Sequence, residues 1–345
     1  MRLAVLLGGS SEERGVSLAS GCEVAAALRS RGHDVIAVDA AGGALSVEEE
    51  RSVLDSGIGR AEIPMHTPRR AAALPESGVV GRVPALRDAE VVFLALHGGA
   101  GEDGTVQTIL EVAGIVYAGS GPLGCALAMD KDLTKRLLRD AGVATPEWIT
   151  GRAPGEEVVA RLGLPVIVKP ASGGSSVGLT LARSVGEVNA AAELAEAGGD
   201  PVLYESYVEG REFTVGVLGR EALPVVEIEP ARELFDFDCK YEPGMARETA
   251  PARIPDGTAQ MLQSAALDVH RVLRLEHFSR VDFLMDEGGG AWCLEANALP
   301  GLTANSLLPK AAAAAGIEFP ELCERICIMG REAGPRRRAG TGSEP

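Results

Sequence analysis

The stretch SRVDFLMDEGGGAWCLEANALPGLTAN, residues 279–305, decides the fold of this chain. It predicts two strands, SRVDFLM and AWCLEAN, because the three glycines at 288–290 suit a hairpin turn. Side chains alternate between the faces of a strand, so Glu295 and Asn297 point the same way, and Asp282 joins them from the neighbouring strand. Two carboxylates and an amide oxygen suit Mg²⁺, which is usually shared with substrate phosphates. The alternative is a solvated acidic hairpin.

Length and charge limit the possible classes of protein. At 345 residues the chain is too long for one ordinary core, so two or three domains are expected, and an apolar fraction of 46% is enough to fill them. The 33 basic and 49 acidic residues give a formal net charge of −16. This charge repels a phosphate backbone and argues against a nucleic-acid partner. An anionic substrate therefore needs a local basic site.

Cysteine usage and hydropathy indicate a cytoplasmic protein. The six cysteines show neither a CxxC motif nor a Cys/His metal spacing, so free thiols in a reducing compartment are the simplest account. The opening MRLAVLLGGS is typical of a first strand and its turn rather than of a cleavable signal. No apolar run is long enough to span a bilayer. We expect a soluble cytoplasmic protein with no membrane partner.

Strands and helices alternate through the first part of the chain. Apolar strands separated by helix-length segments predict a parallel sheet covered on both faces. A surface excursion with no assigned fold is expected over 42–88, and a single basic helix over 122–141. We predict an N-terminal Rossmann-like domain, a small central domain, a C-terminal domain and a disordered tail, with the boundaries 1–120, 121–204, 205–330 and 331–345.

The loop KPASGGSSVG, residues 169–178, is the strongest single nucleotide signal. A strand delivers Lys169 to its end, and the small residues that follow let backbone amides approach phosphate oxygens. It is not a Walker A loop, because the lysine precedes the glycines and no GK[ST] follows. Phosphate binding is favoured over a flexible turn, which would not need a lysine.

Two other glycine-rich turns allow more than one interpretation. Gly8 and Gly9 separate a strand from a helix, where backbone N–H groups can meet an anion, but Glu12 and Glu13 after them can simply cap the helix. The stretch GSGPLG at 119–124 spells a dinucleotide fingerprint. The supporting acid about twenty residues on falls within a predicted helix, so a tight turn entering a new domain is favoured.

Three more segments carry candidate site residues. The acids of YESYVEGRE, residues 204–212, lie on an extended segment that suits contacts to a base and a ribose, or they form a solvated linker. The polar loop around Lys240 and Tyr241 suits a lid, with a plain surface loop as the alternative. His97 ends a buried strand at the sheet edge where binding crevices form. The other four histidines are expected in surface or packing positions.

These motifs occur in the order and spacing of the D-alanine–D-alanine ligases, members of the ATP-grasp superfamily, which the chain resembles from about residue 3 to 328. The resemblance is carried by GGSSEERGVSL, LALHGGAGEDGTVQ, AGSGPLGCALAMDK, GLPVIVKPASGGSSVG, EGREFTV, the Lys240-Tyr241 loop, RVDF and LEANALPGLTANS. It implies an α/β, three-domain ATP-grasp fold with an N-terminal Rossmann-like parallel sheet. ATP is then clasped between the central and C-terminal domains.

The resemblance also implies an activity. Two D-alanine molecules are joined to D-alanyl-D-alanine through an acyl phosphate made with ATP, as a step in peptidoglycan precursor synthesis and therefore in cell-wall biogenesis and cell shape. Two Mg²⁺ ions assist, with Mn²⁺ able to substitute. The family allows a homodimer.

Residue roles follow from the same resemblance. ATP contacts are implied for Lys131, Lys169, Glu205, Glu212 and Lys240. Metal ligation is implied for Asp282, Glu295 and Asn297. A hydrogen-bonded trio near the first amino acid is implied for Glu13, Ser175 and Tyr241. Oxyanion contacts are implied for Arg280 and the backbone of Gly301, and substrate contacts for His97 and Ser306.

Two departures from the family pattern and two rival functions accompany this hypothesis. Gly15 stands where the family often has glutamate, and the motif often written EAKY reads DCKY, which puts Cys239 beside the lid lysine. One rival is a ligase of the same scaffold that makes other dipeptides or a D-alanyl-D-lactate ester, although a lid tyrosine resembles the dipeptide enzymes. The other rival is a nucleotide-binding regulator on a decayed scaffold, against which the intact metal-ligand set argues.

Overall fold

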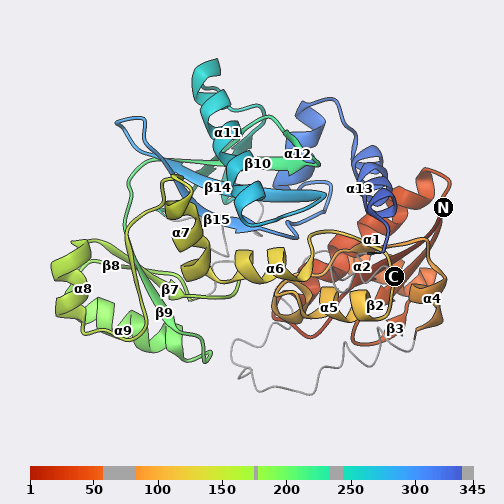
Figure 1. The fold of residues 1–345 in the computed structure, drawn as a ribbon, viewed down its shortest axis with the longest axis horizontal. Helices are drawn as coiled ribbons and strands as arrows, with labels where there is room; N and C mark the ends of the chain where they lie inside the picture. Colours follow the sequence, from red (N-terminus) through yellow and green to blue (C-terminus); the bar gives the residue numbers. More distant parts are fainter. Residues whose placement is uncertain (57–82, 175–177, 234–243, 336–345) are drawn as a thin grey trace, which may run out of the picture.

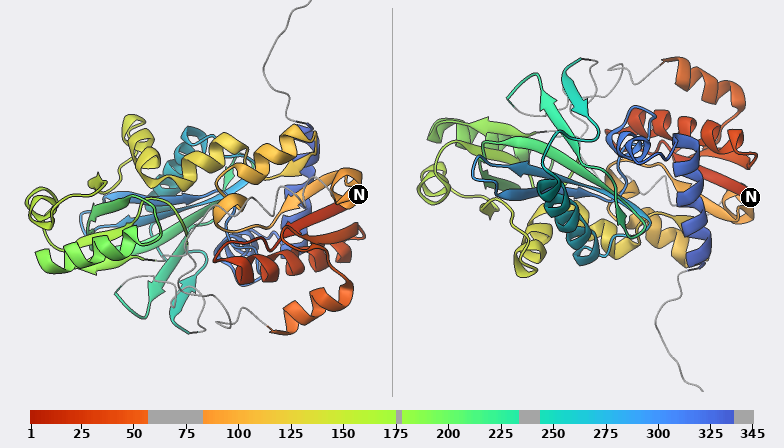
Figure 2. Two further views of the ribbon diagram at one scale, coloured as in Figure 1. Left: turned by 90° about the horizontal axis from the view of Figure 1, so that it is seen from below. Right: turned by 90° about the horizontal axis from the view of Figure 1, so that it is seen from above.

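The computed structural model describes residues 1–56, 83–174, 178–233 and 244–335. Three sheets follow one another along the chain (Figure 1). The five-stranded and four-stranded sheets lie at opposite ends of the molecule, with the six-stranded sheet between them, as the views in Figure 2 also show. No described helix is long and apolar enough to cross a membrane.

The first sheet has the order β3-β2-β1-β4-β5. Its central strand RLAVLL pairs in parallel with β2 and β4 and is buried from its second residue onward, which explains why it is almost entirely apolar. The predicted parallel sheet is therefore confirmed, with a short antiparallel β3 added at its edge. Its strands are β1 (Arg2–Leu7), β2 (Asp34–Asp39), β3 (Gly43–Ala44), β4 (Val91–Leu94) and β5 (Tyr117–Ala118).

Helices cover this sheet from two parts of the sequence. Gly21 lets the first helix approach the sheet closely, because a Cβ built there would lie 2.4 Å from Leu7 Cβ. The last helix also packs against β4, β5 and α1, although it is far away in sequence. The helices of this part are α1 (Arg14–Ser30), α2 (Val47–Ser56), α4 (Pro84–Asp88), the 3₁₀ turn η1 (Gly99–Gly101), α5 (Thr105–Val112) and α13 (Phe319–Ala333).

The sequence predicted no fold for the segment 42–88. Its described residues form β3, α2 and α4. The single helix expected over 122–141 is wrong. The chain forms two helices there, α6 (Pro122–Met129) and α7 (Lys131–Asp140), which meet at Asp130. Asp130 has an extended backbone, and its carboxylate accepts from Leu133 N, so it caps the second helix.

The second sheet is small and antiparallel, with the order β6-β9-β7-β8. Two helices pack on it around an apolar cluster that contains Val166, Val168 and the ring of Tyr204. Its elements are β6 (Trp148–Thr150), α8 (Gly155–Leu162), β7 (Val166–Pro170), β8 (Thr180–Ala182), α9 (Val185–Glu196) and β9 (Val202–Ser206).

The third sheet is antiparallel, with the order β13-β12-β10-β14-β15 and β11 paired to β10. The predicted hairpin is present as its last two strands, and the glycines at 288–290 lie in the turn. A cluster of apolar residues from α6, α7 and α11 packs with β10 and β14. The elements are β10 (Arg211–Leu218), β11 (Glu221–Ala222), β12 (Val226–Pro230), β13 (Ala246–Thr249), α11 (Asp256–Val272), β14 (Phe278–Met285), β15 (Ala291–Asn297) and α12 (Leu307–Ala314).

Candidate active site

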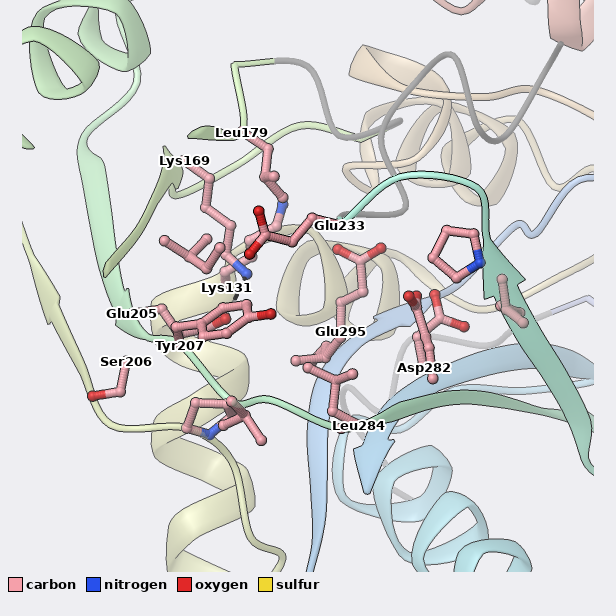
Figure 3. A pocket seen from close by; sticks show the side chains of 18 of the residues that line it. Lys131, Lys169, Leu179, Glu205, Ser206, Tyr207, Glu233, Asp282, Leu284 and Glu295 are labelled. Carbon is pink, nitrogen blue, oxygen red and sulfur yellow. Dashed lines mark hydrogen bonds and ion pairs between the residues drawn. The ribbon is translucent and has the colours of Figure 1, made fainter. Parts of the chain in front are cut away.

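A cavity of about 400 Å³ is lined by residues of the second and third sheets. Figure 3 shows lysines and a glutamate on one side of it and two carboxylates on the other. The cavity brings together six of the residues that the sequence singled out, namely Lys131, Lys169, Glu205, Glu212, Asp282 and Glu295. These residues come from α7, β7, β9, β10, β14 and β15, so the cavity depends on the packing of the two sheets.

The carboxylate of Glu205 lies between two ammonium groups. Its Oε2 is 2.5 Å from Lys135 Nζ, and its Oε1 is 3.1 Å from Lys169 Nζ. All three residues are buried. Burial alone would raise the pKa of Glu205, but the two ammonium charges outweigh it, so the pKa is lowered and the carboxylate stays ionised.

The loop that follows Lys169 contacts the start of α7. Lys131 Nζ donates to the carbonyl of Gly173 at 2.6 Å, and its backbone N–H donates to the carbonyl of Ala171 at 2.9 Å. Gly173 has φ +102°, which favours glycine, and it lines the cavity with Gly174. The loop, β7 and the start of α7 therefore bring small residues and two lysines to the cavity, and a phosphate role for Lys169 stays a prediction.

The connection from β9 to β10 forms another wall of the cavity. Ser206, Tyr207, Val208 and Gly210 line it there. A Cβ on Gly210 would lie 2.2 Å from the carbonyl oxygen of Met285, so a side chain at this position would clash with the hairpin. Apolar side chains complete the cavity between its charged groups, and such a slot suits a flat ring; they are Ile167, Leu179, Ile228, Leu284 and Leu294.

The predicted metal ligands lie on the hairpin. Asp282 on β14 lies opposite Glu295 on β15 in the strand register, and the register shifts between Asp282 and Phe283. Asp282 accepts two hydrogen bonds from Arg280, at 2.9 Å each, one from Thr214 Oγ1 at 2.6 Å and one from Asn297 Nδ2 at 3.0 Å.

The donor set of this hairpin fits Mg²⁺. Asp282 and Glu295 line the same cavity as the lysines, so two carboxylates lie at one place, and the side-chain amide of Asn297 is beside them, where its nitrogen donates to Asp282. Within the described ranges, no group of three or more His, Cys, Asp and Glu side chains is placed to hold a metal ion. Oxygen ligands suit Mg²⁺, which is usually shared with substrate phosphates, whereas structural zinc sites use cysteine and histidine.

Glu13 lies where the first sheet meets the phosphate loop. Cβ atoms built on Gly98 and Gly174 would lie 2.4 Å and 2.9 Å from Glu13 Oε2, so both glycines make room for this carboxylate. The charge of Glu13 acts on a second carboxylate, that of Glu102. Burial of the carboxylate, followed by the charge of Glu13, raises the pKa of Glu102 to about 7.

His97 holds the backbone that follows the metal hairpin. Its Nδ1 is 3.0 Å from the carbonyl oxygen of Leu299, and its Nε2 is 3.2 Å from Ser20 Oγ. Ser20 Oγ also accepts from Leu302 N at 3.4 Å, and Glu102 Oε1 accepts from Leu299 N at 3.3 Å. Burial lowers the pKa of His97 to about 4, so the ring is neutral near pH 7. The structure thus gives His97 contacts within the protein.

Gly301 and Ser306 lie together in the turn after the hairpin. Ser306 Oγ accepts from Thr303 N at 3.1 Å, and a Cβ built on Gly301 would lie 3.1 Å from Ser306 Oγ. Ser306 is the N-cap residue, directly before α12, so it lies at a helix N-terminus, where an anionic group is favoured. Three predicted site residues lie outside the described residues, and they are Ser175, Lys240 and Tyr241.

Sequence reasoning missed three residues of this site. Lys135 lies one helical turn after Lys131 in a segment predicted to be helical, so the spacing was a usable signal. Glu102 stands in the same LHGGAGEDG motif as His97, and only the histidine was selected. No pattern in the sequence indicated Tyr207 as a cavity residue.

Comparison with known proteins identifies related chains. Residues 2–120 match the model of the D-ala D-ala ligase N-terminus, and residues 137–328 match that of the D-ala D-ala ligase C-terminus. A D-alanine–D-alanine ligase of Alkalilimnicola ehrlichii is 40% identical over 341 residues, which are 98% of this chain and 96% of the relative. The ligase of Dechloromonas aromatica is 40% identical over 94% of this chain and 96% of its own length.

Solved structures give the same result. The D-alanine–D-alanine ligase of Bacillus anthracis complexed with ATP has a TM-score of 0.74 and 29% identity, covering 96% of this chain and 98% of that one. The VanG D-Ala:D-Ser ligase of Enterococcus faecalis has a TM-score of 0.78 and 30% identity, covering 95% and 98%. The ATP-grasp fold expected from the sequence is therefore confirmed.

Proposed function

This chain belongs to the D-alanine–D-alanine ligase family, and we propose that it joins two D-alanine molecules at the expense of ATP, supplying a precursor of peptidoglycan. The observation that carries this proposal is one cavity with Lys131 and Lys169 facing Asp282 and Glu295. Enzymes that transfer a phosphoryl group use lysines and Mg²⁺ held by oxygen ligands to neutralise the charge on that group.

ATP binding uses the cavity as a whole. Glu205 and Glu212 are proposed to contact the base and the ribose, beside the apolar slot. Lys131, Lys169 and, from the lid, Lys240 neutralise phosphate charge. Asp282, Glu295 and Asn297 would hold Mg²⁺, which when bound supplies further charge neutralisation on the transferring phosphoryl group.

The first step converts a poor acyl donor into a good one. A carboxylate oxygen of the first D-alanine attacks the γ-phosphorus, the bond to the β-phosphate oxygen breaks, and ADP leaves. We place the first D-alanine beside Glu13, in the trio with Ser175 and Tyr241 and close to His97. Closure of the Lys240-Tyr241 loop would exclude water, which otherwise hydrolyses the acyl phosphate.

The second step forms the amide. The free amine of the second D-alanine attacks the acyl carbon, the bond from that carbon to the phosphate oxygen breaks, and the departing phosphate takes up the proton that the amine loses. Negative charge builds on the former carbonyl oxygen, where Arg280 and the Gly301 N–H are proposed to donate. Ser306, at the start of α12, is proposed to bind the second carboxylate.

A substrate panel tests this function. Phosphate release from ATP is measured with each D- and L-amino acid and with D-lactate, and the product is identified by mass. D-Alanine alone is expected to support turnover and to give D-alanyl-D-alanine. If D-alanine does not stimulate phosphate release but another amino acid does, the enzyme makes a different dipeptide. If no amino acid stimulates phosphate release, a nucleotide-binding regulator is favoured.

Cellular context and cofactor choice belong to the same proposal. We infer a cytoplasmic enzyme, because ATP and free D-alanine are its substrates. Mn²⁺ is expected to replace Mg²⁺, since both accept hard oxygen ligands. The division of the chain at residues 120 and 204, and assembly as a homodimer, stay predictions. Sedimentation of the purified protein measures the latter.

A further inference from the structure

We propose that Lys135 is a positioning residue of the nucleotide site, which holds the Glu205 carboxylate while Lys169 exchanges that carboxylate for a phosphate of ATP. The inference rests on the proposed function, because it assigns a role within the same nucleotide cavity. Lys135 lies on α7, one turn after Lys131, and Glu205 lies on β9.

The two lysines differ in where they stand relative to the cavity. Lys169 lines it, as does Glu205, whereas Lys135 is behind the carboxylate, with no exposed side-chain surface. Each carboxylate oxygen takes one ammonium group, Oε1 from the cavity side and Oε2 from behind. A ligand in the cavity can therefore compete for Lys169 but not for Lys135.

The ammonium of Lys135 is held by two hydrogen bonds and an ion pair. It donates to Thr145 Oγ1 at 2.6 Å and to the carbonyl of Pro146 at 3.3 Å, in addition to the ion pair with Glu205. Two of the three N–H donors of this ammonium are used in those hydrogen bonds, and Glu205 Oε2 meets the group as an ion pair. It also lies 5.5 Å from the ring centre of Trp148. These contacts fix Lys135 in place.

Lys169 is held much less firmly. Among the described residues, Glu205 is the one polar partner of its ammonium group. If Lys169 turned toward a phosphate and Lys135 were absent, a buried carboxylate would be left without a counter-charge, which is strongly unfavourable. Lys135 removes that obstacle, because it keeps Glu205 paired and oriented. Oε1 is then open to an N–H donor of the bound base.

The arrangement predicts which part of ATP each lysine helps to bind. Lys135 acts through Glu205, so its loss should weaken every ligand that carries the base. Lys169 acts on phosphate, so its loss should matter more as phosphates are added. Adenosine, ADP and ATP separate the two roles, because they share the base and differ in phosphate number.

The experiment is calorimetric titration of the full-length protein with adenosine, ADP and ATP. Lys135→Met is expected to lower the affinity for adenosine about tenfold, the size of one lost charge-assisted hydrogen bond, and to lower the affinities for ADP and ATP by at least as much, because Lys169 is then the remaining counter-charge of Glu205. Lys169→Ala is expected to spare adenosine and to weaken ATP most. Lys135→Met should also raise the KM for ATP while leaving the KM for D-alanine unchanged. Equal binding of adenosine by Lys135→Met and native protein would overturn the inference.

A double-mutant cycle separates positioning from general stability. In a Glu205→Gln background, Lys135→Met is expected to have little further effect on ATP affinity, since the residue it acts through has changed. Additive losses would show a merely structural role. Arg29→Met is the matched control, because it breaks another pair with a buried glutamate, Arg29–Glu50, in the first sheet's layer. It should lower stability without changing the KM for ATP.

A milder variant covers the case in which Lys135→Met does not fold. Thr145→Val removes one acceptor of the Lys135 ammonium and keeps the size of the side chain. A rise of about two- to fivefold in the KM for ATP supports the inference, and an unchanged KM contradicts it. Failure of the native protein to bind any of the three ligands would instead sink the proposed function.

Discussion

The proposed nucleotide end of the site, around Glu205, and the proposed amino-acid end, around Glu13 and Glu102, each contain an enclosed glutamate carboxylate, and the two carboxylates have opposite pKa shifts. Glu205 has two lysine ammonium groups against its oxygens, and its pKa is lowered. Glu102 accepts hydrogen bonds from the backbone N–H groups of Gly98 and Leu299, with the charge of Glu13 nearby, and its pKa is raised to about 7. Burial raises the pKa of both carboxylates; the two ammonium charges reverse this effect at Glu205, whereas the charge of Glu13 adds to it at Glu102.

This difference matches the proposed chemistry of the two ends. A ligand that carries several negative charges needs cations beside its phosphates, and Lys131 and Lys169 line the cavity at this end. A substrate that carries its own ammonium group needs carboxylates that can share a proton or accept one. Arg280 connects the two ends, since it is bonded to Asp282 and its charge acts on both His97 and Glu102.

The largest expected effect comes from removing a charge where the two ends meet. Asp282→Asn or Glu295→Gln keeps the shape of the side chain but removes a metal-binding charge. Turnover should fall by at least about 10²-fold, because stabilisation of the transferring group is lost. The measurement is phosphate release with saturating D-alanine and ATP.

Asp286→Asn is the matched control for these variants. Asp286 lies in the turn of the same hairpin and accepts from Trp292 Nε1 and Gly290 N, away from the metal-ligand positions. It should keep near-native turnover. Equal losses at Asp282 and Asp286 would mean that hairpin stability, rather than metal binding, was being measured.

The second prediction isolates the nucleotide end. Lys169→Ala should weaken ATP binding by about 10- to 100-fold, because an ammonium aimed at phosphate is worth roughly 1.5–3 kcal/mol. Binding of D-alanine should change little. Calorimetry with each ligand alone measures both. Equal losses for ATP and D-alanine would remove the distinction between the two ends.

The third prediction uses the opposite pKa shifts of the two glutamates. A raised pKa, as in Glu102, contributes stability that is present below the unfolded value near 4.5 and is lost as the pH rises through about 7. Glu102→Gln is neutral throughout, so it should gain stability relative to the native protein across that window, by on the order of 1–3 kcal/mol.

Glu205→Gln should show the reverse trend. A lowered pKa contributes stability that is present above the unfolded value and is lost as the pH falls through the folded one. The variant should therefore be destabilised near pH 7, and the gap to the native protein should narrow in acid. Urea unfolding at a series of pH values measures both variants. Parallel curves for the two would show that burial alone governs these carboxylates.

The sequence predicted the parts of this molecule that depend on local pattern. The alternation of strands and helices, the hairpin at 279–297 and the lysine loop after β7 are all written in neighbouring residues. It did not predict that α13 packs on the first sheet, because an amphipathic helix shows which face is buried but not what covers it. The break at Asp130 was missed because the apolar pattern continues across it.

The same limit applies to the site. Charged residues that follow strands were found, since their position alone indicates a binding edge. The role of Lys135 required knowing that β9 brings Glu205 against α7, and the role of Glu102 required knowing that the turn after β15 reaches the first sheet. Those are contacts between distant segments, which one sequence does not specify.

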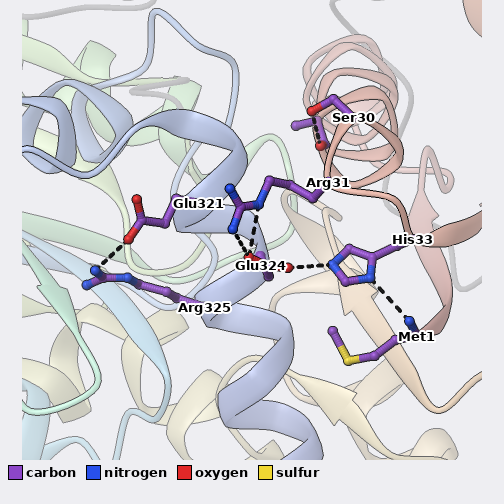
Figure 4. Close-up of polar contacts among 8 residues, drawn as sticks. Met1, Ser30, Arg31, His33, Glu321, Glu324 and Arg325 are labelled. Carbon is purple, nitrogen blue, oxygen red and sulfur yellow. Dashed lines mark hydrogen bonds and ion pairs between the residues drawn. The ribbon is translucent and has the colours of Figure 1, made fainter.

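The smallest expected effect supplies the surface reference for this comparison. Glu324 on α13 pairs with Arg31 and with His33, whose other ring nitrogen faces the N-terminal amine of Met1 (Figure 4). The cluster joins α13 to the end of α1, but the Arg31 side chain is 45% exposed, so water and salt screen the pair. Glu324→Gln should lower the free energy of unfolding by less than about 1 kcal/mol, and by less still in high salt.

Urea unfolding of Glu324→Gln and Glu205→Gln at low and high salt makes the comparison. A loss as large as that of Glu205→Gln would mean that the two enclosing lysines give Glu205 no special importance. If Glu324→Gln lowers the free energy of unfolding only slightly, and less in high salt, the exposed pair is weaker than the buried pairs of Glu205 with Lys135 and Lys169.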